Sequence, residues 1–208
     1  MTRSSWRAVP LAVISVLALA GPAAAQDVVV SGSPASPFPQ NKQNEPSVAV
    51  DPLDPSILIA GSNDELDESA CSGSDCSFVT GIGNSGVYFS TTGGTSWTQP
   101  TYHGFTGRGR GGAPGADRTG VQGDIGTLPN YAEAGLVSDG DPAVAFGPRF
   151  AHGAFSHDNG EQAYYANLTS NFSGGKSDEA FRGYEAIAVS HTTDLREAMA
   201  GSTTSDNG

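Results

Sequence analysis

Cationic residues are scarce in this 208-residue chain. It has 10 lysines and arginines against 22 aspartates and glutamates, a formal net charge of -12 at pH 7. Residues 1–25 hold two arginines and no acid, so the chain that follows them carries -14. Proteins that bind nucleic acid concentrate lysine and arginine to neutralise phosphates. The charge balance therefore argues against a nucleic-acid partner and favours a soluble acidic surface.

Long apolar runs are also lacking. The longest, residues 8–20, is interrupted by Pro10 and Ser15 and is too short to span a bilayer, which takes about 20 apolar residues. It follows Arg3 and Arg7 and precedes a small-residue stretch ending at Ala25, the pattern of a secretory signal peptide. We expect cleavage after Ala25, a secreted, extracellular or periplasmic location, and no membrane span.

The chain has only two cysteines, Cys71 and Cys76, in the segment Cys-Ser-Gly-Ser-Asp-Cys. A zinc site would need further thiol or imidazole ligands, and no histidine or other cysteine lies within twenty residues of the pair. Because export permits disulfides, the spacing favours a local Cys71–Cys76 disulfide that pins a loop.

Glycine and proline, in contrast, are abundant, with 28 and 13 copies. This composition suits short strands and turns and predicts an all-β protein. Expected strands cover 47–51, 57–61, 86–90, 95–98, 142–146, 152–156, 162–168 and 186–190, with a turn at Gly147-Pro148. The helical pattern at 195–200 is too short to count. We divide the chain into the signal peptide (1–25), an extended leader (26–43), a β region (44–200) with a long Gly-rich loop at 99–135, and a polar tail (201–208).

One pattern repeats within the β region. Residues 45–51, Glu-Pro-Ser-Val-Ala-Val-Asp, match residues 141–147, Asp-Pro-Ala-Val-Ala-Phe-Gly, at an offset of 96 residues. A propeller blade takes about 40–50 residues, so the offset fits either two blades or one blade with a long insertion. Each unit opens with an acid-Pro step into an apolar strand.

The segment Ser-Thr-Thr-Gly-Gly-Thr-Ser-Trp at 90–97 carries a family resemblance. It resembles the Asp box, the Ser-x-Asp-x-Gly-x-Thr-Trp hairpin of sialidase-like β-propellers, also called a BNR repeat. Ser90, Gly94 and Trp97 match, whereas Thr92 replaces the aspartate and Ser96 replaces the threonine. An ordinary Gly-Gly hairpin with a core tryptophan is the alternative. A second, degenerate version of the motif at 189–194 lacks the glycine and the tryptophan.

This resemblance covers roughly residues 44–194 and implies a fold and a function. The fold would be sialidase-like propeller blades in an incomplete ring, since the chain holds signals for two to three blades and a closed ring needs about 4–8. We therefore expect a fragment of a longer protein. The implied function is a secreted, sialidase-like or glycoside-hydrolase-like protein directed at extracellular carbohydrate and inactive as this fragment. The alternative is a non-enzymatic extracellular binding or scaffolding propeller.

The sequence lacks part of the residue set that exo-sialidase chemistry requires. The family uses an arginine triad, and its usual Phe/Tyr-Arg-Ile-Pro opening segment is missing. Arg108, Arg110 and Arg118 cluster in the Gly-rich loop, where solvated side chains are the commoner outcome. Asp139 and Asp141 precede a strand, either as carboxylates near a propeller channel or as turn caps.

Other chemistry-bearing residues give weaker signals. Asp64, Asp67 and Asp75, with Glu65 and Glu68, could offer oxygen ligands to Ca²⁺, although not at EF-hand spacing. The sequence indicates no other cofactor. His103, His152, His157 and His191 are scattered and match no nucleophile motif. Glycosylation sequons begin at Asn167 and Asn171.

We predict that Cys71 and Cys76 are oxidised in the exported protein, because an oxidising compartment closes so short a cysteine pair. Thiol titration of the denatured, unreduced protein should detect no free thiol. Two free thiols per chain would contradict the assignment.

Overall fold

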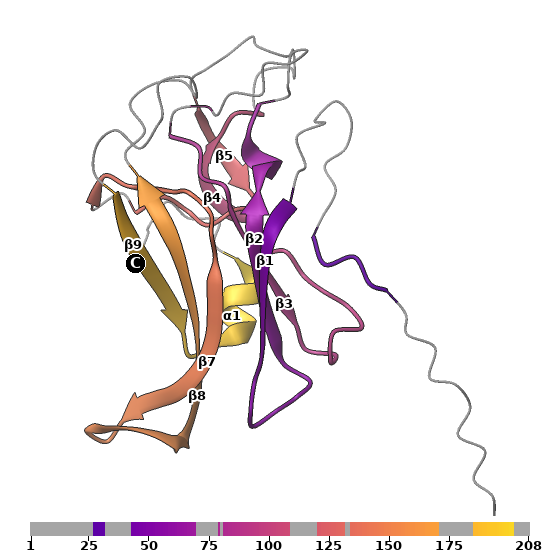
Figure 1. Ribbon diagram of the computed structural model, residues 1–208, viewed down its shortest axis with the longest axis vertical. Coiled ribbons are helices and arrows are strands. Elements are labelled where there is room, and N and C mark those ends of the chain that lie inside the picture. The colour runs from indigo at the N-terminus through magenta and orange to yellow at the C-terminus, as the bar shows by residue number, and fades with distance from the viewer. Residues whose placement is uncertain are drawn as a thin grey trace, which may run out of the picture.

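The computed structural model describes residues 27–31, 43–69, 79, 81–108, 120–131, 134–170 and 185–201. The expected signal peptide, the Cys71–Cys76 pair, Asp75, Arg110, Arg118 and Asn171 lie outside these residues. The described chain is mostly β-sheet, as the composition predicted (Figure 1). Its elements are β1 (Gln43–Val50), β2 (Leu58–Asp64), a 3₁₀ turn (Glu65–Asp67), β3 (Ser85–Ser90), β4 (Tyr102–Thr106), β5 (Val121–Ile125), β6 (Val137–Ser138), β7 (Ala143–Ala151), β8 (Ala154–Ser170), β9 (Glu185–Thr192) and α1 (Leu195–Ala200).

The first sheet is an antiparallel meander in the order β1-β2-β3. Its β1–β2 connection is the predicted Asp-Pro turn. The Asp51 carboxylate accepts hydrogen bonds from the backbone N–H groups of Leu53 (2.8 Å) and Asp54 (3.2 Å). The aspartate thus satisfies donors that the turn would leave unpaired.

The second sheet has the order β6-β8-β7, with β9 also paired to β8. The turn expected at Gly147-Pro148 is wrong, because β7 runs through both residues with only a register shift at Pro148/Arg149. The chain turns instead at His152 and Gly153, both at positive φ (54° and 83°). A proline is tolerated in β7 because this is an edge strand.

The segment 99–135 is not the uniform loop expected. It contains β4 and β5, which pair antiparallel from Tyr102↔Ile125 to Thr106↔Val121. The sequences Tyr-His-Gly-Phe-Thr and Val-Gln-Gly-Asp-Ile each carry a central glycine and little apolar alternation. That composition lacks the apolar alternation that predicts a strand, so the pairing of β4 with β5 depends on tertiary contacts.

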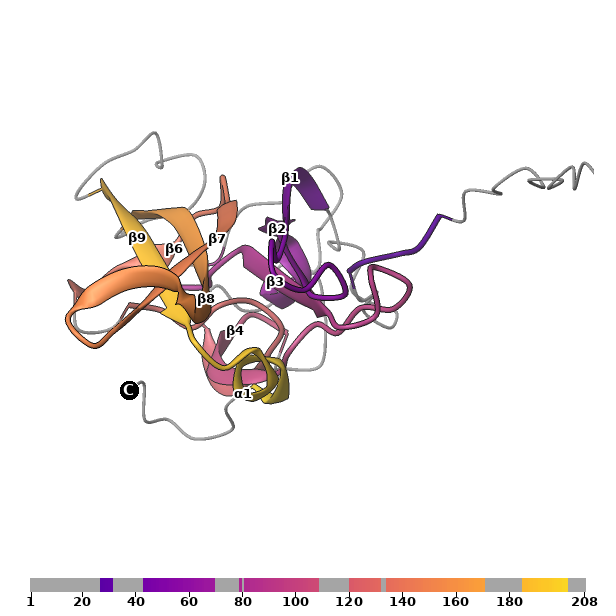
Figure 2. The same cartoon turned by 90° about the horizontal axis from the view of Figure 1, so that it is seen from below.

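The two large sheets pack face to face (Figure 2). Ile59, Val87 and Phe89 from the first sheet and Ala163 and Tyr165 from the second form one buried cluster. α1 adds to this cluster through Leu195, Ala198 and Met199, capped by the Asp194 carboxylate. The helix is therefore present, contrary to expectation, because packing supports what propensity alone would not.

The sequence repeat is also a structural repeat. β1 and β7 are the first strands of their antiparallel meanders, and they lie side by side (Figure 1). The Val144 backbone N–H donates to Ser47 Oγ (3.2 Å) across the junction. The acids that open the two repeats, Glu45 and Asp141, share positive φ angles of 54° and 48°. The described residues form two larger sheets and the two-stranded β4–β5 sheet, and they do not form a closed ring.

Within the described residues, no helix has the length and apolarity that a bilayer crossing would require.

We predict that Gly61→Ala destabilises the fold. A Cβ at Gly61 would lie 2.7 Å from Cε2 of Tyr165 and 3.0 Å from Cβ of Pro142, inside the contact between the sheets. Overpacking of this kind lowers the free energy of unfolding by about 1–3 kcal/mol. Urea titration measures the change.

Gly123→Ala in β5 is the matched control, because its Cβ would meet Thr106 Cγ2 at an ordinary 3.6 Å. Equal stability of the two variants would show that the sheets do not depend on the close approach at Gly61.

Candidate functional site

The hairpin at 90–97 has an internal hydrogen-bond pattern that explains its sequence. Ser90 Oγ accepts from the backbone N–H groups of Thr92 (3.2 Å) and Gly94 (3.0 Å). Thr92 Oγ1 accepts from the Ser96 N–H (2.9 Å), and Trp97 Nε1 donates to the Gly94 carbonyl (3.0 Å). Thr92 thus bonds across the turn, where an aspartate would in an Asp box. The return strand expected at 95–98 is only an isolated bridge, Phe89↔Thr98.

The two acids that open the repeats meet at the sheet junction. Asn63, on β2, donates from Nδ2 to Glu45 Oε2 (2.9 Å) and accepts at Oδ1 from the Asp141 backbone N–H (2.6 Å). Hydrogen bonding to the Asp141 side chain, helped by that carboxylate's charge, raises the pKa of Glu45. We call Glu45, Asn63 and Asp141 the acid pair site.

The backbone beside the acid pair site has room only for glycine at position 140. At Gly140, where φ is +81°, a Cβ would fall 2.2 Å from Asn63 Oδ1. Asp139, its neighbour, is directed elsewhere: its N–H donates to the Leu168 carbonyl (2.8 Å) and its carboxylate accepts from Ser170 Oγ (3.4 Å). Asp139 is therefore bonded to β8, whereas Asp141 joins the acid pair site.

Both carboxyl groups of the acid pair site are exposed to solvent, and the chemistry open to them follows from their separation. The Asp141 side chain acts on the Glu45 carboxyl through hydrogen bonding and charge, and raises its pKa. Glycoside hydrolases hold their two carboxyl groups about 5 Å apart or more, so that a sugar or a water fits between them. The acid pair site is therefore suited to accepting hydrogen bonds from hydroxyl or amine groups.

Asp64 and Asp67, the proposed calcium ligands, are fully buried and are hydrogen-bonded to protein donors. Asp64 accepts from Tyr88 Oη (2.7 Å), Gln99 Nε2 (2.8 Å), Gln43 Nε2 and the Leu66 N–H (both 2.9 Å). Burial, together with this carboxylate, raises the pKa of Tyr88 well above its usual range. Among the described residues no group of three His, Cys, Asp or Glu side chains could hold a metal.

Asp67 fixes the β4–β5 region to the first sheet. Its Oδ2 accepts from Gly126 N (2.9 Å), Thr127 N (3.0 Å) and Thr127 Oγ1 (2.8 Å), and its Oδ1 pairs with Arg108. Burial raises the pKa of Asp67, against the lowering effect of Arg108 and these hydrogen bonds. Arg108 is therefore a structural partner, and the described chain does not bring it into an arginine triad.

A hollow of about 380 Å³ lies beside Arg108 and is lined by polar and apolar groups that include Gln99, Asp124 and Pro100. Two of its polar side chains, Gln99 and Arg108, are already bonded within the fold. Gln99 Nε2 bonds Asp64 and the Gly126 carbonyl, and Arg108 bonds Asp67 and the Asp124 carbonyl. The hollow therefore offers few donors to a ligand.

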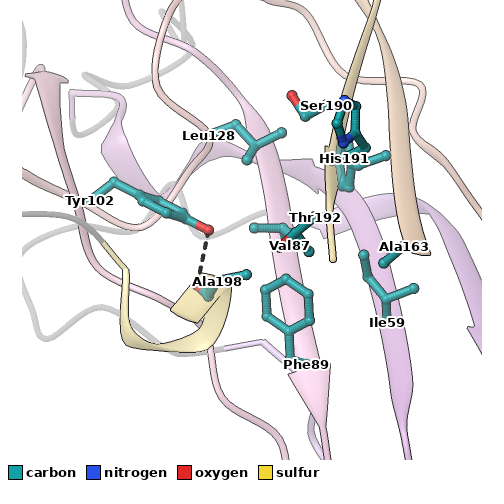
Figure 3. Close-up of a pocket in the computed structure, with 11 residues that line it drawn as sticks. Ile59, Val87, Phe89, Tyr102, Leu128, Ala163, Ser190, His191, Thr192 and Ala198 are labelled. Atoms are coloured by element: carbon teal, nitrogen blue, oxygen red, sulfur yellow. Dashed lines mark hydrogen bonds between the residues drawn. The ribbon is translucent and has the colours of Figure 1, made fainter. Parts of the chain in front are cut away.

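A second cavity, missed from sequence, lies between the sheets and α1 (Figure 3). Its walls are mainly apolar, with Val87, Phe89 and Leu128 among them, and Tyr102 Oη donates across one side to the Ala198 carbonyl (3.4 Å). Its volume is about 120 Å³. Small-molecule sites measure about 300–1,000 Å³, so this cavity is a packing gap.

The four histidines and the glycosylation sequon at Asn167 make contacts within the fold or lie in its strands and turns. His191 stacks obliquely on Tyr164 (ring centroids 6.2 Å apart), His157 pairs with Glu161, His103 lies in β4 and His152 in the β7–β8 turn. Asn167 is buried, donates to Tyr131 Oη (2.8 Å) and accepts from Ser85 Oγ (3.3 Å). The folded chain therefore excludes a glycan at Asn167.

We predict that Arg108→Ala lowers the free energy of unfolding by about 3 kcal/mol, because it leaves the buried Asp67 carboxylate without its cation. Thermal melts measure the loss. Arg149→Ala, at an exposed position of β7, is the control and should change stability by less than about 0.5 kcal/mol. If Arg108→Ala instead melts as the wild type does, Arg108 is not needed for stability and is available to bind a ligand.

The acid pair site is thus the exposed group of side chains that the two repeats build together. No protein-family model, curated protein or solved structure matches this chain, so its interpretation depends on the residues themselves.

Proposed function

We propose that this chain is an exported protein of sialidase-like propeller sheets that binds extracellular carbohydrate without hydrolysing it. The observation that carries the proposal is the acid pair site, where Glu45, Asn63 and Asp141 converge from two sheets. Carbohydrate as the ligand class comes from the resemblance of residues 90–97 to the Asp box. Export comes from the signal-peptide pattern of residues 1–25.

The chemistry of the acid pair site suits a neutral sugar. Adjacent hydroxyl groups of a pyranose can donate to two neighbouring carboxyl groups, and such charge-assisted hydrogen bonds are about twice as strong as neutral ones. Asn63 and the strand starts position both acceptors before a ligand arrives, which lowers the entropic cost of binding. A sugar that carries its own carboxylate would be repelled by the two acids and by the net charge of -12.

Two features support binding over hydrolysis. The carboxyl groups of Glu45 and Asp141 interact with each other, whereas glycoside hydrolases hold their two carboxyl groups about 5 Å or more apart to admit a sugar or a water. Arg108, which could have contributed to recognition of a sialic acid carboxylate, is held by the buried Asp67.

We predict that the purified protein binds immobilised neutral oligosaccharides more tightly than their sialylated counterparts. The double variant Glu45→Gln, Asp141→Asn should weaken that binding by at least about tenfold, because it removes both charged acceptors. Asparagine tolerates the positive φ of residue 141, so the backbone is preserved. Biolayer interferometry measures the affinities.

Asp158→Asn, an exposed acid in β8 remote from the strand starts, is the matched control and should bind as the wild type does. A fluorogenic sialoside should show no turnover. Failure to bind any neutral glycan would refute the carbohydrate proposal, and sialoside turnover would refute the non-catalytic one.

A further inference from the structure

β9 is an outer strand of the second sheet, and β8 is its one neighbour among the described strands (Figure 1). The hydrogen bonds of β8 show which backbone groups of β9 face the free edge. Leu168 of β8 directs its N–H and its carbonyl to Gly140 and Asp139, on the side of β8 away from β9. Leu168 and its β9 partner Ile187 are therefore a non-hydrogen-bonded pair, and the backbone groups of Ile187 point away from β8.

By the same alternation, the odd-numbered residues of β9 direct their N–H and C=O groups to the free edge. In the part of the chain that the structure describes, these groups have no backbone partner. The corresponding edge of the first sheet is paired: Phe89 of β3 exchanges two backbone hydrogen bonds with Thr98 (2.9 and 2.8 Å), and the Ser85 carbonyl accepts from the Leu128 N–H (2.9 Å). The edge of β9 is thus the open counterpart of an edge that the chain covers elsewhere.

This edge lacks the features that keep natural edge strands from pairing, which include lysine, proline and β-bulges. The β9 sequence, Glu-Ala-Ile-Ala-Val-Ser-His-Thr, contains neither residue, and its register with β8 runs without a shift. Ile187 and Val189, on one face of the strand, are 72% and 55% exposed. An added strand would supply main-chain hydrogen bonds and cover part of these two side chains.

The strand is complementary to itself when two copies run antiparallel. Pairing centred on Ala188 places Glu185 opposite His191 of the second copy. It also places Ile187 opposite Val189 of the second copy. Each carboxylate thus meets an imidazole and each apolar side chain meets another, twice over because of the two-fold symmetry. These pairs join odd-numbered residues, so the free N–H and C=O groups of the two edges meet.

Other registers of β9 with itself are less favourable. The register centred on Val189 is equally long, but it sets Ile187 opposite His191 and leaves Glu185 without a partner in the strand. A shift by one residue would set the free backbone groups against groups that already bond to β8. Charge and hydrogen-bond geometry therefore both select Ala188 as the centre.

We propose that two copies of this chain associate by antiparallel pairing of their β9 strands about a two-fold axis at Ala188. The interface joins the two second sheets edge to edge, and because it is isologous it closes at a dimer. Each copy carries a formal net charge of -12, and moderate salt screens the resulting repulsion. Sedimentation velocity of the purified chain over a concentration series in moderate salt should show a monomer–dimer equilibrium.

Cysteine cross-linking tests the register. The two Ala188 Cα atoms would lie about 4.5 Å apart, the spacing of a non-hydrogen-bonded pair and within the range of a disulfide. Ala188→Cys should therefore form a covalent dimer under mild oxidation, and the wild type treated in the same way controls for the native cysteines.

Ser190→Cys is the matched control for the cross-link. Ser190 lies on the same face of the strand as Ala188, but it would pair with Ala186 of the second copy. The two copies of residue 190 would lie about 14 Å apart along the strands, too far for a disulfide. Ser190→Cys should form no covalent dimer alone, and a mixture with Ala186→Cys should form one.

Charge exchange tests the side-chain pairing. Glu185→Lys removes the carboxylate opposite His191 in both halves of the interface and should weaken dimerisation by about threefold or more. Adding His191→Glu to the same chain exchanges the two charges and should restore the affinity. Glu197→Lys, the same charge change at an exposed position of α1, is the control and should not weaken dimerisation.

Three results would overturn the proposal. The first is a wild-type chain that stays monomeric at every concentration. The second is an Ala188→Cys variant that forms no covalent dimer although its thermal melt is cooperative, or a Ser190→Cys variant that cross-links alone equally well. The third is a Glu185→Lys, His191→Glu chain that dimerises no better than Glu185→Lys.

Discussion

The close approach of the two sheets at Gly61 is the constraint on which the rest of the structure depends. With no Cβ there, the ring of Tyr165 lies against the β2 backbone, and its hydroxyl donates to the Gly86 carbonyl at 2.8 Å. Burial raises the pKa of Tyr165 far above its usual range, so the hydroxyl remains a donor at any physiological pH. The same approach brings β1 beside β7. Without it, Glu45 and Asp141 would open two unrelated strands, and the acid pair site would not exist.

Buried carboxylates hold the parts of the chain that do not belong to the repeat. Asp67 collects donors from Gly126 and Thr127, some 60 residues away, and Asp64 collects the side chains of Tyr88 and Gln99. A run of acidic residues suggests a cation site when the neighbouring sequence shows no hydrogen-bond donors for its carboxylates. Here the protein supplies those donors itself from distant segments. Burying an ionised carboxylate is tolerated only when hydrogen bonds and a cation such as Arg108 compensate for the lost water.

The parts of the fold that could be predicted are those with a local signal. Strands with clear apolar alternation, such as β1 and β2, were placed within a few residues, and the acid-Pro repeat marked equivalent strands of the two sheets. β4 and β5 could not be found, because their central glycines and polar residues pair only through tertiary contacts. Of the candidate site, the sequence indicated Asp141 but not its partners. No short-range pattern shows that Asn63 bridges two acids whose strands lie 96 residues apart in the chain.

An exposed apolar sheet face occurs in this protein together with a strongly acidic composition. A sheet with two apolar faces can bury only one of them against a single neighbour, and the second sheet keeps its other face uncovered, with Ile187 72% and Val189 55% exposed. Exposed apolar strands are an aggregation hazard, and net charge is a general means of keeping such a protein soluble. An excess of acids over bases, here 22 against 10, makes like molecules repel one another at long range.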